Sequence, residues 1–270
     1  MEQKIQTSAN RFSDVCPLIL AAGQGKRMRN INEPKVMCKL HNKSLIEHLL
    51  DHIGASNLDI KPTVVVGHGG EFIRKQLGDS VHYVEQKKPL GTGDAVKSAR
   101  TFLENKCGHV LVFYGDHPYV PAYVINELVS VHKGREATIT MTTTVVPDFE
   151  AWRKDLDAYG RIVRDHDDTI ERIVESKDAT EDEKKIHELN VGYYCFEAGW
   201  LWKNIDELSN SNTQGEYYLT DLVQMAIKLG KKVTSLTIDP IVSIGVNTEE
   251  QLQQAQKLLY GKMGLGAAHS

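Results

Sequence analysis

The chain has 270 residues, of which 41% are hydrophobic and 25% are charged. These values are typical of a globular protein with one large domain, or a domain plus a small appendage, and the chain is long enough to bury its core without disulfides or structural metal. Its 32 basic and 36 acidic residues give a net charge of −4, which argues against nucleic acids or anionic membranes as partners. A local basic pocket for a phosphorylated small molecule remains compatible with this charge.

The cysteines are widely separated and form no Cys-x-x-Cys pair: Cys16, Cys38, Cys107 and Cys195. This spacing argues against a zinc ribbon, a thioredoxin motif or a disulfide scaffold, and it favours a cytoplasmic location. No apolar run approaches the roughly 20 residues needed to span a bilayer, so we expect no membrane insertion. Residues 15–22 are apolar but follow mixed charges and lead into a glycine loop, so we expect no signal peptide.

The first half of the chain alternates short apolar runs with helical patterns. The runs predict strands at Val15–Leu20, Thr63–Val66, Val81–Val84 and Val110–Tyr114. Between them, a capping box at Ser44 and Glu47 begins one helix, a second spans Thr92 to Leu103, and Pro121 is predicted as the first residue of a third. Such alternation predicts a mostly parallel sheet covered by helices on both faces.

Strands joined by charged turns dominate after about residue 137. The expected strands are Ala137–Val145, Arg161–Arg164, Ile170–Val174 and Val191–Phe196. They predict a β-rich insertion at the rim of the sheet. Helical patterns return at Tyr218–Leu229 and Thr248–Leu259, and we expect the last ten residues to form a fraying tail.

A glycine loop follows the first strand directly, with the sequence LAAGQGKRM over residues 20–28. Glycines at this place let the backbone approach a phosphate, and free N–H groups there bind anions. The spacing fits neither the Walker A loop nor the dinucleotide fingerprint, and a simple tight turn explains the pattern equally well. Arg27 and Lys35 favour the phosphate interpretation, because they put two cations close to the loop.

Asp116 follows the strand Val110–Tyr114, where open α/β sheets bind their ligands. A carboxylate there suits a hard cation that bridges phosphates. The alternative is a helix cap, since Pro118 and Pro121 indicate that a helix starts soon afterwards.

The glycine loop followed by Pro34-Lys35 resembles the signature of the sugar-phosphate nucleotidylyltransferases. Later segments resemble the N-acetylglucosamine-1-phosphate uridylyltransferase branch, the pyrophosphorylase half of a bifunctional bacterial enzyme. These segments are Gln86–Gly93, Tyr114–Pro118, Tyr159–Ile162, Ile173–Thr180, Glu188–Gly192, Gln214–Asp221 and Gly245–Asn247. They occur in the family's order across residues 17–259. The resemblance implies that UTP and N-acetyl-α-glucosamine 1-phosphate react, with Mg²⁺, to give pyrophosphate and UDP-N-acetylglucosamine, a peptidoglycan precursor.

The resemblance also implies a Rossmann-like α/β nucleotidyltransferase fold of the GT-A-like type. It has a mixed, mostly parallel central sheet flanked by helices, and a small β-rich sugar-binding insertion. The expected divisions are a flexible extension at 1–14, a nucleotide-binding half at about 15–135, a sugar-binding half at about 136–250, and a C-terminal helix and tail at 251–270. The chain has no run of hexapeptide repeats, so we expect no left-handed β-helix domain and no acetyltransferase activity in it.

The resemblance also implies which residues contact the phosphates and the metal ion. Lys35 and Arg27 are implied to be catalytic and to bear charge on the triphosphate and the leaving pyrophosphate. Asp116 and Asn247 are implied to bind magnesium. We expect Lys35 to lie on an exposed loop and to add little to folding stability. His117 replaces a residue that is usually apolar in this branch, and we assign it no catalytic role.

The implied nucleotide-binding residues are Leu20, Ala21, Ala22, Gly23, Gln86, Gly91 and Thr92. A glutamine amide offers both a donor and an acceptor, which suits the edge of a pyrimidine. Thr92 also fits an ordinary helix N-cap. The implied sugar-binding residues are Tyr114, Gly160, Glu175, Asn190 and Asn247.

Other functions remain open from the sequence. One is the same chemistry on another pair, such as glucose 1-phosphate with UTP or dTTP. Another is a non-catalytic nucleotide-sugar sensor. The expected partners are UTP and N-acetylglucosamine 1-phosphate, and a homo-oligomer is compatible with the sequence.

Overall fold

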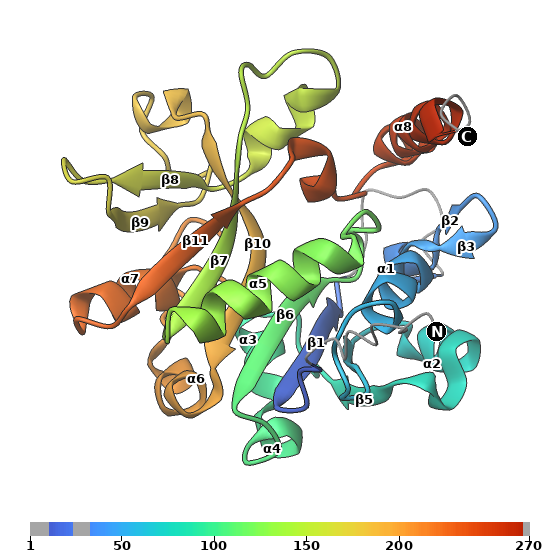
Figure 1. The fold of residues 1–270 in the computed structure, drawn as a ribbon, viewed down its shortest axis with the longest axis horizontal. Helices are drawn as coiled ribbons and strands as arrows, with labels where there is room; N and C mark the ends of the chain where they lie inside the picture. The colour runs from blue at the N-terminus through green and yellow to red at the C-terminus, as the bar shows by residue number, and fades with distance from the viewer. Residues whose placement is uncertain (1–10, 24–32, 267–270) are drawn as a thin grey trace, which may run out of the picture.

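A nine-stranded mixed sheet forms the centre of the computed structural model, which describes residues 11–23 and 33–266, the last eight through their backbone alone (Figure 1). The main strands run across it in the order β11 (Val233–Thr237), β7 (Ile139–Val145), β10 (Glu188–Glu197), β6 (His109–Tyr114), β1 (Val15–Ala21), β4 (Thr63–Val66) and β5 (His82–Glu85). All neighbours in this order pair in parallel except β10, which is antiparallel to both β6 and β7. The predicted mixed, mostly parallel sheet is therefore confirmed.

Helices cover both faces of the sheet. Their bounds are α1 (Leu45–Gly54), α2 (Gly70–Leu77), α3 (Thr92–Ser98), α4 (Arg100–Leu103), α5 (Ala122–Gly134), α6 (Ala198–Asn204) and α7 (Asp221–Lys228). The last helix, α8 (Glu249–Gly266), packs instead against the segment Lys39–Leu40. Side chains alternate along each strand, so Ile19 and Phe113 join the core with α1, α2 and α5, whereas Leu18 and Val112 join the core with α3, α6 and α7. Both faces are thus apolar, as a sheet between two helical layers requires.

A β-rich insertion extends from one end of the sheet. The hairpin of β8 (Arg161–Arg164) and β9 (Ile170–Val174) joins the sheet where Arg161 pairs with Leu189 of β10. The 3₁₀ segment η3 (Ala151–Ala158) precedes it. A short hairpin of β2 (Lys39–Leu40) and β3 (Lys43–Ser44) leads into α1.

Several predicted boundaries differ from those observed. The predicted helix Thr92–Leu103 is interrupted at Ala99, which separates α3 from α4. Pro121 caps α5 with an extended backbone and is not its first residue. The predicted tail is wrong over residues 261–266, because the backbone of α8 remains helical to Gly266.

The sequence patterns gave no assignment to some elements that the structure contains. The strand β11 is short, lies at the sheet edge and is only partly buried, so its apolar signal is weak. The chain also joins the fold before the predicted boundary at residue 15, since Phe12 bridges to Leu58. Within the described residues, no helix is both long and apolar enough to cross a membrane.

Candidate active site

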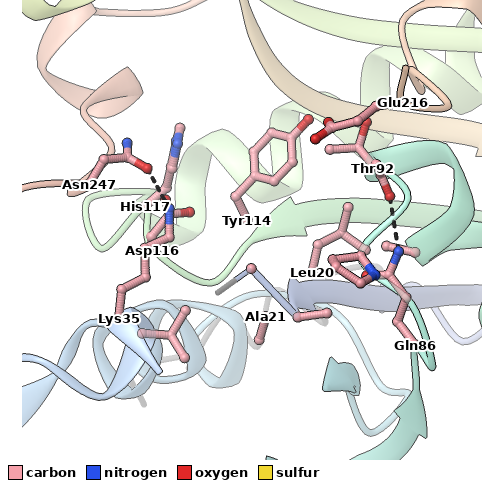
Figure 2. A pocket seen from close by; sticks show the side chains of 16 residues that line it. Leu20, Ala21, Lys35, Gln86, Thr92, Tyr114, Asp116, His117, Glu216 and Asn247 are labelled. Carbon is pink, nitrogen blue, oxygen red and sulfur yellow. Dashed lines mark hydrogen bonds and ion pairs between the residues drawn. The ribbon is translucent and has the colours of Figure 1, made fainter. Parts of the chain in front are cut away.

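A cavity of about 600 Å³ opens beyond the carboxyl ends of β1 and β6 (Figure 2). Its lining residues are Leu20, Ala21, Ala22, Gly23, Lys35, Val36, Gln86, Pro89, Gly91, Thr92, Ala95, Tyr114, Asp116, His117, Glu216 and Asn247. The parallel strands set this position, because the carboxyl ends of β1 and β6 meet with Leu20 opposite Tyr114. Figure 2 shows a charged end with Lys35, Asp116 and Asn247, and a second end with Gln86 and Thr92.

The charged end is built around the ammonium group of Lys35. Lys35 donates hydrogen bonds to the carboxylate of Asp116 and to the side-chain oxygen of Asn247. The Lys35 side chain is only 17% exposed. The expectation of an exposed loop lysine is therefore wrong, because its charge pairs with Asp116 at the end of β6.

The environment of Asp116 favours its charged form. Burial alone would raise the pKa of Asp116, but the Lys35 ammonium beside it lowers this pKa below its usual range. The helix-cap alternative for Asp116 is not observed, because the cap of α5 is Pro121. Asp116 thus presents a carboxylate to the cavity.

Backbone contacts hold the two oxygen donors together. The Val246 N–H donates to the Asp116 carbonyl over 2.9 Å, which joins the end of β6 to the segment before α8. The Asn247 N–H donates to the side-chain oxygen of Gln251 over 2.7 Å, and the Gln251 N–H donates to the Thr248 hydroxyl over 3.2 Å. The first turn of α8 therefore orients Asn247.

His117 packs beneath this end of the cavity. Its Nδ1 lies 2.8 Å from the hydroxyl of Tyr193, which donates to the Val242 carbonyl over 3.0 Å. A Cβ on Gly245 would meet the His117 ring at 2.4 Å, so the ring lies directly against the backbone before Asn247. His117 is thus a packing and hydrogen-bonding residue next to the site.

The other end of the cavity is formed by the loop before α3. Gly91 has φ +109°, and a Cβ there would meet the Tyr217 carbonyl at 2.6 Å, so only glycine fits this turn. Gly91 is also the cap of α3, which corrects the expectation that Thr92 is its N-cap. The Thr92 hydroxyl instead accepts from the Leu219 N–H over 3.1 Å.

The remaining sugar-site candidates lie beyond Tyr114 and do not line the main cavity. The Asn190 N–H donates to the Gly160 carbonyl over 2.8 Å, and a Cβ on Gly160 would lie 3.6 Å from Glu175 Oε2. Glu175 accepts from the Thr220 hydroxyl over 3.0 Å, and burial raises the pKa of Glu175. Gly160 therefore lies next to both polar residues, and the three residues form a second cluster.

Asn190 is oriented by its own strand. Its Oδ1 accepts from the Gly192 N–H over 3.2 Å and from the Tyr194 hydroxyl over 2.9 Å. These bonds leave its amide NH₂ as the available group. Gly192 lies where the register of β10 shifts, and a Cβ there would meet the Tyr114 ring at 2.3 Å. Tyr114 thus packs between the main cavity and the second cluster.

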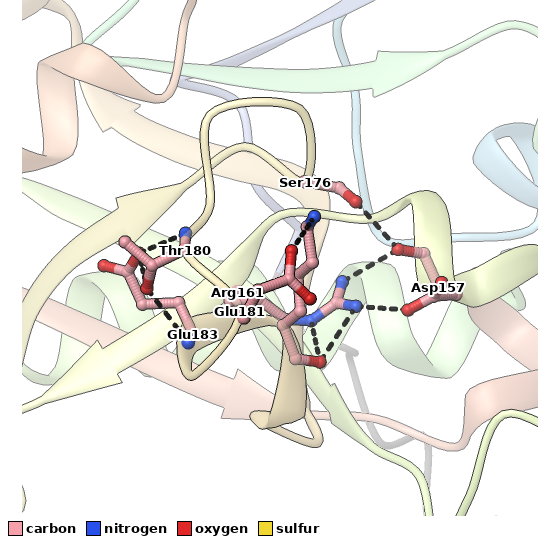
Figure 3. Close-up of polar contacts among 7 residues, drawn as sticks. Asp157, Arg161, Ser176, Thr180, Glu181 and Glu183 are labelled. Carbon is pink, nitrogen blue, oxygen red and sulfur yellow. Dashed lines mark hydrogen bonds and ion pairs between the residues drawn. The ribbon is translucent and has the colours of Figure 1, made fainter.

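A fully buried arginine holds the insertion that carries this cluster. The guanidinium of Arg161 donates to the carbonyl of Asp157 over 3.0 Å and to that of Lys184 over 3.3 Å (Figure 3). The Ser176 hydroxyl also donates to the Asp157 carbonyl over 3.0 Å. Arg161 follows Gly160 and Ser176 follows Glu175, so these bonds support both sugar-site candidates.

The predicted site residues therefore divide into three groups. The cavity brings together the nucleotide candidates, the charged-end candidates and one sugar candidate, Tyr114. The nucleotide candidates are Leu20, Ala21, Ala22, Gly23, Gln86, Gly91 and Thr92, and those of the charged end are Lys35, Asp116 and Asn247. Gly160, Glu175 and Asn190 form the neighbouring cluster. Arg27 lies outside the described residues. Sequence reasoning gave no site role to the lining residues Val36, Pro89, Ala95, His117 and Glu216, although Pro89, His117 and Glu216 lie within segments that carried the resemblance.

The oxygen atoms at the charged end of the cavity are suitable ligands for a divalent cation. Asp116 and Asn247 direct one carboxylate and one amide oxygen at a single cation, the Lys35 ammonium. Such hard oxygen donors suit Mg²⁺, which commonly takes few protein ligands and completes its shell with phosphates and water. Among the described residues, no group of three or more His, Cys, Asp or Glu side chains could hold a metal ion.

A cavity at the carboxyl ends of parallel strands is where open α/β proteins bind their ligands. Residues 16–239 match the nucleotidyl transferase family model. The bifunctional protein GlmU of Brevibacillus brevis is 39% identical over 257 residues, 94% of this chain and 54% of that protein. GlmU of Clostridium beijerinckii is 39% identical over 251 residues, 93% of this chain and 53% of that protein.

A solved structure has the same architecture. UDP-glucose pyrophosphorylase complexed with UDP-glucose superposes with a TM-score of 0.72 at 18% identity, covering 93% of this chain and all of that one. This likeness confirms the Rossmann-like fold. The chain belongs to the nucleotidyl transferase family and spans about half the length of the curated relatives it matches.

Proposed function

We propose that this chain transfers a uridylyl group from UTP to N-acetyl-α-D-glucosamine 1-phosphate. The products are UDP-N-acetylglucosamine and pyrophosphate. The observation that carries the proposal is the polarity of the cavity, with Gln86 at one end and Lys35, Asp116 and Asn247 at the other. A nucleoside triphosphate suits this arrangement, because its base needs directed hydrogen bonds and its phosphates need cations. The curated relatives named GlmU support the choice of substrates.

The reaction needs no general base. The sugar phosphate is already anionic at neutral pH, and its oxygen attacks the α-phosphorus of UTP directly while pyrophosphate leaves. The main barrier is the repulsion between two anions, so catalysis depends on positioning and on preorganised positive charge. Lys35, and Arg27 as the resemblance implies, would supply that charge.

Asp116 and Asn247 would hold a magnesium ion in the proposed reaction. A bound magnesium ion would neutralise charge on the reacting phosphates. Lys35 would then leave the oxygens of Asp116 and Asn247, and its ammonium would be available to the triphosphate. Asp116 would remain charged throughout, because it is next to a cation in either state.

The second polar cluster suits the sugar. Glu175 retains Oε2 as an acceptor, and Asn190 retains its amide NH₂ as a donor, since their other polar atoms are already bonded within the chain. One acceptor and one donor match the N–H and C=O of an acetamide. This complementarity supports N-acetylglucosamine 1-phosphate over glucose 1-phosphate.

A substrate panel tests the proposal. Each of several sugar 1-phosphates is mixed with each nucleoside triphosphate and Mg²⁺, and pyrophosphate release is measured. We expect the highest kcat/KM for UTP with N-acetylglucosamine 1-phosphate, because a site that hydrogen-bonds the acetamide discriminates against sugars without it. Equal kcat/KM for glucose 1-phosphate would contradict the sugar assignment. No pyrophosphate from any pair would favour a nucleotide-sugar sensor.

A further inference from the structure

The side chain of Gln86 is held in one orientation before any ligand binds. Gln86 is 7% exposed, and its backbone N–H donates to the Val66 carbonyl over 2.8 Å. Its side-chain Nε2 donates to Asp94 Oδ2 over 2.7 Å and to the Gly91 carbonyl over 3.1 Å. Both amide hydrogens therefore have partners within the chain.

The chemistry of these partners fixes which end of the amide faces the cavity. The ionised carboxylate of Asp94 and the carbonyl of Gly91 can only accept hydrogen bonds, so both require the NH₂ group of Gln86. The bond to Asp94 is charge-assisted and therefore the stronger of the two. Since Gln86 lines the cavity, its Oε1 is the polar side-chain atom left to meet a bound molecule. Gln86 thus presents an acceptor alone.

We propose that Asp94 is a positioning residue that makes this cavity select pyrimidines with an N–H at position 3, uracil or thymine, over cytosine. The inference rests on the proposed binding of a nucleotide base near Gln86. Uracil presents N3–H to the Gln86 oxygen, whereas cytosine presents a lone pair at the same position. Two facing acceptors leave both atoms without a hydrogen bond, and Asp94 prevents the amide from turning over to relieve the mismatch.

Binding of UTP and CTP isolates this effect, because the two bases are similar in size and differ at this edge. Dissociation constants are measured by titration calorimetry with Mg²⁺ for the wild type and for Asp94→Asn. The wild type is expected to prefer UTP by about tenfold or more, the usual cost of a buried unpaired polar group. The introduced asparagine amide can accept or donate, so Asp94→Asn should reduce this preference about tenfold.

Two further variants separate orientation from folding. Asp206→Asn is a matched control, because Asp206 pairs with Lys97 of α3 and with Arg100 but not with Gln86. It should retain the wild-type preference. In a Gln86→Met background, Asp94→Asn should leave the ratio of the two dissociation constants unchanged, because the group through which Asp94 acts is gone.

Each remaining outcome is decisive. If Asp94→Asn keeps the preference, or weakens UTP and CTP by the same factor, Asp94 has no orienting role and the inference is wrong. If the wild type binds UTP and CTP equally, Gln86 does not read this edge of the base. If the wild type binds neither nucleotide, the proposed function itself fails.

Discussion

Asp116 and Asn247, which are distant in the sequence, direct their side-chain oxygens at the same ammonium group, that of Lys35. The Val246 N–H and the Asp116 carbonyl join the two segments directly, so the convergence is part of the fold. The Lys35 ammonium is thus a cation that the chain itself places between these two oxygens. The predictions below follow from this arrangement and from the buried groups around it.

Replacing Lys35 by Met should reduce both activity and stability. Loss of one preorganised charge-stabilising group typically costs about 3–4 kcal/mol, so turnover should fall 10²- to 10³-fold. Without the Lys35 ammonium, the Asp116 carboxylate is buried with no counter-ion. The free energy of unfolding of the metal-free protein should therefore fall by about 1–3 kcal/mol, and Mg²⁺ should restore part of this loss. Pyrophosphate release and thermal unfolding with and without Mg²⁺ measure the two effects.

The matched control is Lys39→Met, because Lys39 is exposed and its ammonium lies 3.5 Å from Glu47. It should change neither property appreciably, as is usual for surface ion pairs. If Lys35→Met is active and its stability is unchanged, Lys35 is only a surface charge and the account of the charged end is wrong.

Replacing Glu175 by Gln should weaken sugar binding selectively. The glutamine keeps the size of the side chain and an oxygen for Thr220, but it presents NH₂ where Glu175 presents Oε2. We expect the KM for N-acetylglucosamine 1-phosphate to rise about 10- to 100-fold while the dissociation constant for UTP stays the same. Glu171→Gln, an exposed change on β9, the strand that ends just before Glu175, is the control. Equal weakening of both substrates would argue against a sugar-specific role.

The stability of the protein should decrease in acid because of His132. This side chain is fully buried, with Nδ1 2.9 Å from the Thr140 hydroxyl and Nε2 3.0 Å from His109 Nδ1. Burial, together with His109 and Lys133, lowers the pKa of His132 from 6.5 to about 4. Between pH 6.5 and pH 4, His132 is therefore protonated in the unfolded chain but not in the folded chain. The free energy of unfolding is thus highest above pH 6.5 and falls as the pH decreases towards 4.

Urea unfolding at pH 7 and pH 5 measures this effect. Between pH 7 and pH 5, the free energy of unfolding should fall by about 2 kcal/mol more in the wild type than in His132→Gln. The reason is that glutamine can hydrogen-bond but does not titrate in this range. An equal loss in both proteins would show that His132 is protonated in the folded state or that other groups dominate.

Much of the fold could be predicted because each signal was local. The apolar run ending at Tyr114 identified a central strand, and Asp116 after it identified the ligand-binding edge. The capping box was equally local, and Glu47 accepts from the backbone and the hydroxyl of Ser44 over 2.7 and 2.6 Å. The edge strand β11 had too few buried residues to give such a signal.

The site was less predictable because its contacts are formed between distant segments. Nothing near Asn247 in the sequence indicates that it meets Asp116, and only the family resemblance suggested the pair. Lys35 was expected to be exposed because its ion pair exists only in the folded chain. The orientation of Gln86 likewise depends on Asp94 in the first turn of α3, and no sequence pattern identifies this pair.

The most direct test of the proposed site is a double-mutant cycle on Asp116 and Asn247, read as pyrophosphate release from UTP and N-acetylglucosamine 1-phosphate over a magnesium titration. Asp116→Asn should abolish most activity, and Asn247→Ala should be weaker and more easily rescued by Mg²⁺. Because Asp116→Asn breaks the same ion pair as Lys35→Met, its loss of stability should be similar, about 1–3 kcal/mol. Because Asp116 and Asn247 would act through one ion, the loss in the double variant should be smaller than the product of the single losses. Fully multiplicative losses, or an Asp116→Asn protein that loses far more stability than Lys35→Met, would contradict a shared magnesium site.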